Sequence, residues 1–344
     1  MLTPMNVLPA RSIPKPVCTA FARLLIAVVL GLVCSQPARA AWHERVVDGI
    51  MGTRISAELW ADEGVDGEAA IDAVMAEMRR IDASMSTYKP DSQVSQVNAQ
   101  AARQPVHISD ELFDLLSKAL EFSRMTDGAF DITYASVGFM YDFRRQQKPS
   151  EEQIKQALPA VNYRHLVLDA KARTVKFTQP GVRIDLGGIA KGHAVDRCID
   201  LLQQRGIKRA LVSAGGDSRI IGDRFGQPWV IGLRHPDRKN EVFQRIPIVD
   251  AAISTSGDYE RFFEKDGIRY HHIIDPHSGR SASLVRSATI IGPNATTTDG
   301  LSKTAFVLGP KKALEIYNRL PGIDAILVAP DGQVLYTQGL EAPE

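Results

Sequence analysis

Two adjacent histidines are the first candidates for proton transfer. His271 and His272 follow Tyr270, and residues 272–274 are expected to form a strand. Neighbouring side chains of a strand point to opposite faces, so at most one of the two histidines should face a site. Imidazole titrates near neutral pH, which favours the role of general base for that histidine. A metal ligand and a structural, hydrogen-bonded histidine are the alternatives.

A glycine pair is a candidate for phosphate binding. Gly187 and Gly188 precede an expected helix, and free backbone N–H groups at a helix start favour an anion. Lys191, one turn into that helix, would add a positive charge. The spacing matches neither the Walker loop nor the Gly-x-Gly-x-x-Gly dinucleotide fingerprint. An ordinary tight turn between a strand and a helix is the alternative.

Tyr88 is a candidate for contact with a planar ring. It lies beside Pro90 in a stretch rich in serine. Its ring either caps a loop or provides a platform on which a flat ligand stacks.

Hydrophobic periodicity predicts the helices and strands that must position these residues. Helices are expected over residues 67–84, 110–125, 188–204, 302–308 and 311–318. Strands are expected over residues 46–59 with a break at Gly52, and over 166–168, 175–177, 210–212, 229–233, 246–249, 251–255, 272–274, 288–291, 325–328 and 334–337. Helices and strands do not alternate regularly, which favours an α+β fold over a doubly wound sheet.

The first 40 residues have the order of a secretory signal peptide. Three basic residues precede an apolar run over 24–33, and the small-residue site Ala38-Arg39-Ala40 follows. We therefore expect cleavage after Ala40 and a mature domain over residues 41–344. The apolar run is about ten residues long, too short to span a bilayer as a helix. A lipoprotein anchor at Cys34 is the less favoured alternative, because Val33 stands where a small residue is normally required.

Charge and cysteine content exclude several classes of partner and site. Of the 41 basic and 40 acidic residues, the first 40 residues hold four basic and no acidic ones, which leaves 37 against 40. Such a balance does not predict nucleic-acid binding, which needs a dense basic face. Cys198 is the only cysteine after residue 40, so the mature chain has no internal disulfide. A metal site would have to use oxygen or imidazole ligands.

Several short polar and glycine-rich stretches follow one another along the chain in a recognisable order. They are Met51-Gly52-Thr53, Ser86-x-Tyr88-x-x-x-Ser92-x-x-Ser95-x-x-Asn98, Gly128-Ala129-Phe130-Asp131-x-Thr133, Asp185-Leu186-Gly187-Gly188-Ile189-Ala190-Lys191-Gly192, Gly215-Gly216-Asp217, Ser256-Gly257-Asp258-Tyr259-Glu260-Arg261, His272-Ile273-Ile274-Asp275-Pro276-x-x-Gly279, and a helix opened by Asp299 and ending near Gly309. This series resembles the ApbE family of FAD:protein FMN transferases over about residues 46–334.

The resemblance implies an activity, a cofactor and a partner. Members of the family bind FAD in an α+β fold of mixed sheets with packed helices, with the FAD site between two subdomains. With Mg²⁺, they transfer FMN to a threonine or serine of a target protein and release AMP. The acceptor motif is Asp-x-x-Thr/Ser-Gly-Ala/Ser-Thr. Such targets are usually exposed outside the cytoplasmic membrane, which agrees with the expected export into the periplasm. An FAD pyrophosphatase and a flavin-binding protein with little catalysis are the alternatives.

The resemblance also implies roles for individual residues. His272 becomes the candidate base that deprotonates the acceptor hydroxyl, with Asp275 suited to orient its loop. Asp131 would accept hydrogen bonds from the cofactor, and Tyr88 would stack on the flavin. The full set of positions implied to contact FAD is Met51, Tyr88, Ala129, Phe130, Asp131, Asp185, Lys191 and Ile273.

The metal site is where this chain departs from the family pattern. The resemblance implies that Mg²⁺ is held by the Gly188 carbonyl, by Asp299, and by a threonine four residues later. Lys303 occupies that last position, and a lysine ammonium offers no oxygen ligand. Thr304 is one residue further, about 100° around a helix, and is a poor substitute.

Two arrangements of Lys303 are open. In one, Lys303 points away and leaves Asp299, Gly188 and water to hold a weaker metal site. In the other, its ammonium takes the place of the metal and neutralises the pyrophosphate. Of the two, we expect the first. With either, metal dependence should be weaker than is usual for the family.

Overall fold

The protein is represented by a computed structural model that describes residues 39–236, 238 and 241–340. The expected signal peptide therefore lies almost wholly outside the described residues. The chain from Arg39 onward forms one compact unit. In the part of the chain that is described, no helix combines the length and the apolar character needed to cross a membrane.

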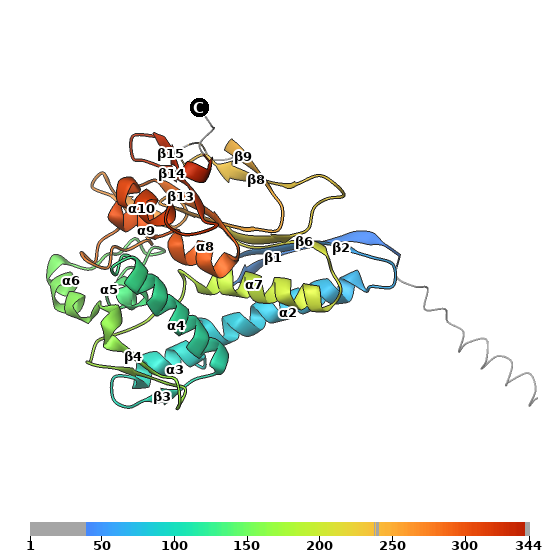
Figure 1. The fold of residues 1–344 in the computed structure, drawn as a ribbon. Coiled ribbons are helices and arrows are strands. Elements are labelled where there is room, and N and C mark those ends of the chain that lie inside the picture. Colours follow the sequence, from blue (N-terminus) through green and yellow to red (C-terminus); the bar gives the residue numbers. More distant parts are fainter. Residues whose placement is uncertain (1–38, 237, 239–240, 341–344) are drawn as a thin grey trace, which may run out of the picture. The chain divides into compact units, whose positions relative to one another are not determined.

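An eight-stranded antiparallel sheet is the centre of the fold (Figure 1). Its order is β1-β2-β6-β7-β10-β13-β14-β15. The strands are β1 (Ala41–Ile50), β2 (Thr53–Ala61), β6 (Arg209–Ala214), β7 (Asp217–Ile221), β10 (Ala252–Gly257), β13 (Ser287–Gly292), β14 (Asp324–Val328) and β15 (Val334–Tyr336). Central β10 and β13 are buried along nearly their whole length, which agrees with layers on both faces of the sheet.

Three helices cover one face of this sheet. In Figure 1, α2 (Gly67–Met85), α7 (Ala190–Gln204) and α8 (Ala295–Leu301) lie on the same side of the strands. Their buried residues recur at helical spacing, as in Ile71, Val74 and Met78 of α2. Each of these side chains is nearly or fully buried, and burying one contributes about 1.5–3 kcal/mol. Hydrophobic burial therefore attaches the helices to the sheet.

The opposite face is covered by a two-stranded ribbon. The strands β8 (Trp229–Arg234) and β9 (Val242–Ile248) pair with each other. Trp229 and Leu233 of the ribbon form a separate hydrophobic cluster with Ile220, Ile253 and Ile326 of the large sheet. The sheet is thus enclosed by helices on one side and by the ribbon on the other.

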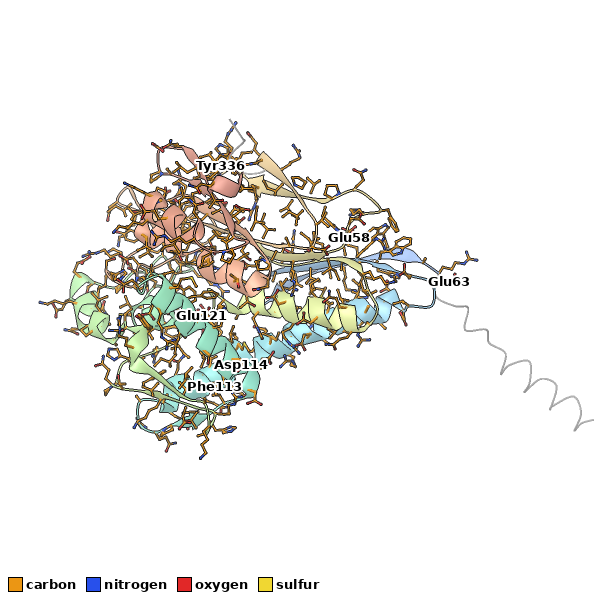
Figure 2. All side chains as sticks on the ribbon, in the orientation of Figure 1. Glu58, Glu63, Phe113, Asp114, Glu121 and Tyr336 are labelled. Carbon is orange, nitrogen blue, oxygen red and sulfur yellow. The ribbon has the colours of Figure 1, made fainter. Side chains whose placement is uncertain are left out.

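A second group of elements packs beside α8. It contains α3 (Gln93–Gln100), α4 (Asp110–Met125), α5 (Ala135–Gly138), α6 (Glu151–Ala157) and a small sheet of β3 (Val106–His107), β5 (Thr174–Phe177) and β4 (Leu166–Asp169). The helix α4 is amphipathic: Phe113 is buried, whereas Asp114 and Glu121 are exposed (Figure 2). The chain is completed by α9 (Thr304–Leu308), α10 (Pro310–Tyr317) and the hairpin of β11 (Phe262–Lys265) and β12 (Ile268–His271).

Most predicted elements are present, and three predictions need correction. The expected strand over 272–274 is wrong, because β12 ends at His271. The helix predicted from residue 188 begins at Ala190. Asp299 does not open a helix, because Asn294 caps α8 by accepting a hydrogen bond from the Thr297 N–H at 2.9 Å. The expected single helix from Asp299 to Gly309 is two helices, separated at residues 302–303.

Two tight turns meet at one end of the large sheet. The β1–β2 turn consists of Met51 and Gly52, both with positive φ, as a two-residue hairpin requires. The β6–β7 turn follows, and a Cβ on its Gly215 would lie 2.6 Å from Oγ1 of Thr53. Only a glycine allows this approach.

Candidate active site

Two lysines and two aspartates form a buried charge cluster where α7, α8 and the sheet meet. Asp299 is fully buried, and its Oδ1 accepts a hydrogen bond from Nζ of Lys303. The same ammonium donates to the Asp299 backbone carbonyl at 2.9 Å. Nζ of Lys191 lies 3.5 Å from Oδ2 of Asp299 and forms an ion pair with Asp217. The expectation that Lys303 points away is therefore wrong.

The environment of the cluster shifts the pKa values of Asp299 and Asp217 in opposite directions. Burial acts to raise the pKa of Asp299, but the charges of Lys191 and Lys303 outweigh it and leave that pKa below its ordinary value. Burial and the negative charge of Asp299 raise the pKa of Asp217. Burial acts to lower the pKa of Lys191, but the charges of Asp217 and Asp299 outweigh it and raise that pKa above its ordinary value. Lys191 therefore stays protonated.

The first turn of α7 is fastened to α8 through Asp299. The Gly192 N–H donates to Oδ2 of Asp299 at 3.1 Å, where the helix dipole favours a carboxylate. A Cβ on Gly192 would lie 2.1 Å from the carbonyl oxygen of Ala295, so only glycine fits. The Gly187 N–H donates to Asp185 at 2.8 Å. Two of the N–H groups that the phosphate-cradle hypothesis requires are thus already used within the protein.

The Phe130 ring and the aliphatic part of Lys303 both lie close to Gly188. A Cβ on Gly188 would be 3.7 Å from Cε of Lys303 and 3.4 Å from the Phe130 ring. Phe130 is buried and packs edge-on against Phe122, with ring centroids 5.8 Å apart. The three positions Gly188, Asp299 and Lys303 are therefore neighbours, as the resemblance implied.

The paired histidines have different environments. Nε2 of His271 contacts the Ala282 carbonyl at 2.6 Å, and the residue is buried, which makes it structural. Nδ1 of His272 is enclosed and has no hydrogen-bond partner, although part of that residue remains exposed. Burial, followed by the charges of Arg261, His271 and Lys303, lowers the pKa of His272 to about 3. His272 is therefore neutral, with one free nitrogen.

Arg261 is a site residue to which the sequence analysis gave no role. Its guanidinium would lie 3.6 Å from a Cβ on Gly52, and its charge acts on both His272 and Tyr134. The described residues include no carboxylate within ion-pair distance of it. The only earlier signal was its place in the Ser-Gly-Asp-Tyr-Glu-Arg stretch, which does not distinguish it from a surface arginine. It is an exposed positive charge beside the candidate base.

Asp185 connects the predicted flavin position to the start of α7. It accepts hydrogen bonds from Oγ1 of Thr87 and from the Tyr134 hydroxyl, both at 2.9 Å. Tyr88, next to Thr87, is 86 % exposed. A flat ring with both faces accessible is free to stack on a ligand. Asp185 holds the segment that carries this ring.

The remaining predicted residues lie mostly in the interior. Asp131 accepts from the Thr133 N–H at 2.8 Å and from the Tyr163 N–H at 2.6 Å, so its carboxylate is already bonded within the protein. This scaffold role differs from the expected contact with the cofactor. Burial raises the pKa of Asp131. Ala129 and Ile273 are buried, and Met51 is half-buried in its turn.

The loop after His272 is fixed by several hydrogen bonds. Asp275 accepts from the His277 N–H at 2.9 Å and from the Ser278 hydroxyl at 2.6 Å. The Tyr141 hydroxyl donates to the Gly279 carbonyl at 2.9 Å. These contacts confirm the prediction that Asp275 orients this loop.

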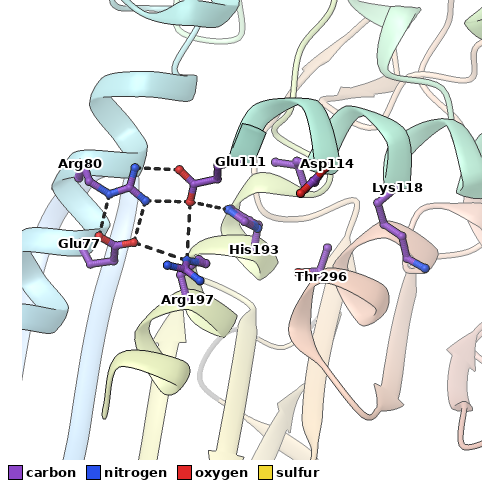
Figure 3. Close-up of a pocket in the computed structure, with 9 residues that line it drawn as sticks. Glu77, Arg80, Glu111, Asp114, Lys118, His193, Arg197 and Thr296 are labelled. Atoms are coloured by element: carbon purple, nitrogen blue, oxygen red, sulfur yellow. Dashed lines mark hydrogen bonds and ion pairs between the residues drawn. The ribbon is translucent and has the colours of Figure 1, made fainter. Parts of the chain in front are cut away.

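A separate hollow of about 560 Å³ lies between α2, α4 and α7 (Figure 3). Its charged side chains neutralise one another: Arg80 bonds to Glu77 and Glu111, and Glu111 also contacts His193 at 3.0 Å. Such a network stabilises the packing of these helices. The hollow includes neither His272 nor the lysine–aspartate cluster, and we do not assign it to catalysis.

The order of the motifs and the arrangement of the site residues indicate one family, and comparison with known proteins tests this. The ApbE family profile matches residues 51–327. This chain belongs to the ApbE family. A relative from Treponema pallidum, named FAD:protein FMN transferase, is 32% identical and covers 92% of this chain and 93% of its own length. A relative of the same name from Escherichia coli is also 32% identical and covers 91% and 93%.

Solved structures agree with this membership in the ApbE family. The ApbE protein of Thermotoga maritima has a TM-score of 0.80 and 35% identity, covering 87% of this chain and 98% of its own. The flavin transferase ApbE of Vibrio cholerae has a TM-score of 0.78 and 28% identity, with the same coverages. The α+β fold with antiparallel sheets is thus a feature that this protein shares with ApbE flavin transferases.

Proposed function

We propose that this protein transfers the FMN part of FAD to a threonine or serine hydroxyl of another protein and releases AMP. The observation that carries this proposal is that relatives named FAD:protein FMN transferase match more than nine-tenths of the chain. The arrangement around His272 supports it, because a neutral imidazole with a free nitrogen lies beside several positive charges.

Each group has a defined part in the proposed reaction. The neutral imidazole of His272 accepts the proton of the acceptor hydroxyl as the oxygen attacks the phosphorus of the FMN phosphate. The phosphoanhydride bond to AMP breaks, and AMP leaves with the electron pair. Negative charge grows on the phosphoryl oxygens, and cations beside them lower the barrier. Lys303 and Arg261, whose charges act on His272, are the cations that could supply this stabilisation.

The exposed ring of Tyr88 and the hydrogen-bonded segment that carries it support FAD binding. The ring of Tyr88 would stack on the isoalloxazine, while Asp185 keeps the neighbouring Thr87 in place. Lys191 would contribute positive charge near the pyrophosphate, although Asp217 and Asp299 already partly neutralise it. Met51, Ala129, Phe130 and Ile273 would shape the wall around the cofactor.

The residues present do not fit the Mg²⁺ that the family resemblance implies. Mg²⁺ requires near-octahedral oxygen ligands. Oδ1 and the backbone carbonyl of Asp299 accept from Lys303, and Oδ2 accepts from the Gly192 N–H. In residues 39–340, apart from 237, 239 and 240, no group of three His, Cys, Asp or Glu side chains could hold a metal. Metal dependence should therefore be weaker than in relatives with an oxygen ligand at position 303.

Hydrolysis of FAD to FMN and AMP is the alternative reaction, with water in place of the acceptor hydroxyl. The same base and cations would serve it, so the difference lies in whether the site excludes water. The named relatives favour transfer, and they also favour an enzyme over a protein that only binds flavin.

Export sets the place where the protein would act. The basic, apolar and small-residue order of residues 1–40 supports cleavage near Ala40 and delivery to the periplasm. The proposed partner is an exported or membrane-bound protein that displays the motif Asp-x-x-Thr/Ser-Gly-Ala/Ser-Thr.

Co-expression with a target carrying that acceptor motif tests the proposed function. Transfer predicts flavin fluorescence that stays with the target band in a denaturing gel and disappears when the acceptor threonine is replaced by alanine. Free FMN and AMP without a fluorescent target would indicate hydrolysis instead. Retained FAD without any product would indicate binding alone.

A further inference from the structure

We propose that the Lys303 ammonium is the built-in cation of the active site and removes the requirement for a divalent metal in the reaction. This inference rests on the proposed function and deepens it, because it names the group that would balance the pyrophosphate charge.

The contacts of Lys303 place its charge where a metal ion would be held. Its Nζ bonds to the Asp299 carboxylate and to the Asp299 backbone carbonyl, the latter at 2.9 Å. One ammonium thereby occupies two oxygen atoms that could otherwise bind a cation. Its aliphatic part passes Gly188, with Cε 3.7 Å from where a Cβ would lie. The lysine thus fills the space between Gly188 and Asp299.

The opposite oxygen of Asp299 is occupied as well. Oδ2 accepts the Gly192 N–H at 3.1 Å and lies 3.5 Å from Nζ of Lys191. Mg²⁺ could bind Oδ1 and the carbonyl of Asp299 only if Lys303 moved away, and Oδ2 only in competition with the Gly192 N–H. A divalent ion would also meet two partly buried ammonium groups, and like charges at short range in a poorly solvated site repel strongly.

The lysine is oriented toward the reacting groups. Its side chain is 17% exposed, whereas that of Asp299 is fully buried, so the lysine is the more accessible partner of the pair. Its charge acts on His272, the candidate base. An anion bound beside His272 would therefore meet this ammonium.

The ordinary interpretation is an i,i+4 ion pair that only fastens α8 to the start of α9. Such pairs on exposed helices contribute little to stability. The two interpretations differ in their predictions. If the ion pair is only structural, replacing Lys303 should not change how activity responds to Mg²⁺; if Lys303 is the built-in cation, replacing it should change that response. Lys303→Thr is decisive, because it removes the ammonium and supplies a hydroxyl at the position where the family has threonine.

The experiment compares wild type, Lys303→Thr and Lys303→Met, with Lys312→Met as the exposed control on α10. FAD affinity is measured by quenching of flavin fluorescence, and FMN transfer to a target is measured in EDTA and across a Mg²⁺ titration. We expect wild type and Lys312→Met to bind FAD and transfer FMN equally in EDTA and in Mg²⁺. We expect Lys303→Met to lose about 100-fold or more in transfer in both conditions.

Lys303→Thr should behave differently from both. It should lose FAD affinity and transfer in EDTA and regain them when Mg²⁺ is added, which converts the protein to a metal-dependent one. Thermal unfolding of each variant checks that it folds, and Lys303→Arg, which keeps the charge, should retain transfer in EDTA.

Two results would overturn the proposal: loss of wild-type transfer in EDTA with recovery in Mg²⁺, or full transfer by Lys303→Thr in EDTA. These outcomes are distinct from failure of the proposed function itself. In that case wild type would flavinylate no target in any condition, while the dependence of FAD binding on Mg²⁺ would still show whether Lys303 replaces the metal.

Discussion

His272 is held beside Arg261, and its backbone N–H donates to the carbonyl oxygen of Arg261 over 3.1 Å. The β11–β12 hairpin produces this contact. Phe262 pairs with His271, so Arg261 and His272 follow as the next opposed residues at its open end. After burial, the Arg261 charge is the largest influence that lowers the pKa of His272. One hairpin therefore positions the candidate base and keeps it neutral.

Substitutions of the two adjacent histidines should have different effects, one on FMN transfer and the other on stability. His272→Asn should reduce transfer by about 10²–10⁴-fold, as expected for loss of a general base, while FAD binding and thermal stability change little. His271→Asn should lower the unfolding temperature, because it disturbs the buried contact with the Ala282 carbonyl. Transfer rates, FAD titrations and melting curves measure these effects. Normal transfer by His272→Asn would exclude it as the base.

The pH dependence of kcat/KM should report on the His272–Arg261 pair. A base must be unprotonated, so activity falls as the pH drops through its pKa. Because the pKa of His272 is lowered to about 3, its protonation should not reduce kcat/KM between about pH 8 and 5. Arg261→Gln removes one lowering charge and should move the acid limb to higher pH. An acid limb near the ordinary histidine pKa that Arg261→Gln leaves in place would contradict this account.

Tyr88 should matter for FAD and not for folding. Stacking of a flat ring on an aromatic side chain contributes about 1–3 kcal/mol. Tyr88→Ala should therefore weaken FAD binding by about fivefold or more, and Tyr88→Phe should not. Because Tyr88 is 86 % exposed, neither variant should change the unfolding temperature. Equal FAD affinity of the alanine variant and wild type would remove Tyr88 from the binding site.

Gly192 should be required for the contact between α7 and α8. In Gly192→Ala, the new Cβ would lie 2.1 Å from the Ala295 carbonyl oxygen, and separating the helices should cost about 1–3 kcal/mol. Gly188→Ala is the matched control, since its nearest contacts are at 3.4 Å and 3.7 Å. Chemical denaturation measures both. Equal stability of the two variants would show that α8 is not packed on α7 in this way.

Much of the fold could be predicted from local patterns, because long amphipathic segments such as α2 and α4 carry their signal in the spacing of apolar residues. The strand expected over 272–274 was wrong because the apolar residues Ile273 and Ile274 are buried in a loop, which periodicity cannot distinguish from a strand. The break between α8 and α9 was missed because no proline or glycine marks residues 302–303.

Site residues could be predicted where the residue type itself indicates the chemistry. They could not be predicted where the role depends on contacts made only in the folded chain. His272 and Asp275 could be chosen from residue type and motif order. The scaffold role of Asp131 depends on Tyr163, thirty-two residues away, whose N–H it accepts. The direction of Lys303 depends on its rotamer, and the importance of Arg261 depends on the hairpin register. Neither of these is visible in the sequence.

The most direct test of FMN transfer is the intact mass of an acceptor protein after incubation with the purified enzyme and FAD. The account predicts that the acceptor gains the mass of FMN less one water, that fragmentation places the addition on the motif threonine or serine, and that one AMP appears per modified acceptor. An acceptor of unchanged mass, with FMN and AMP released in equal amounts, would contradict it.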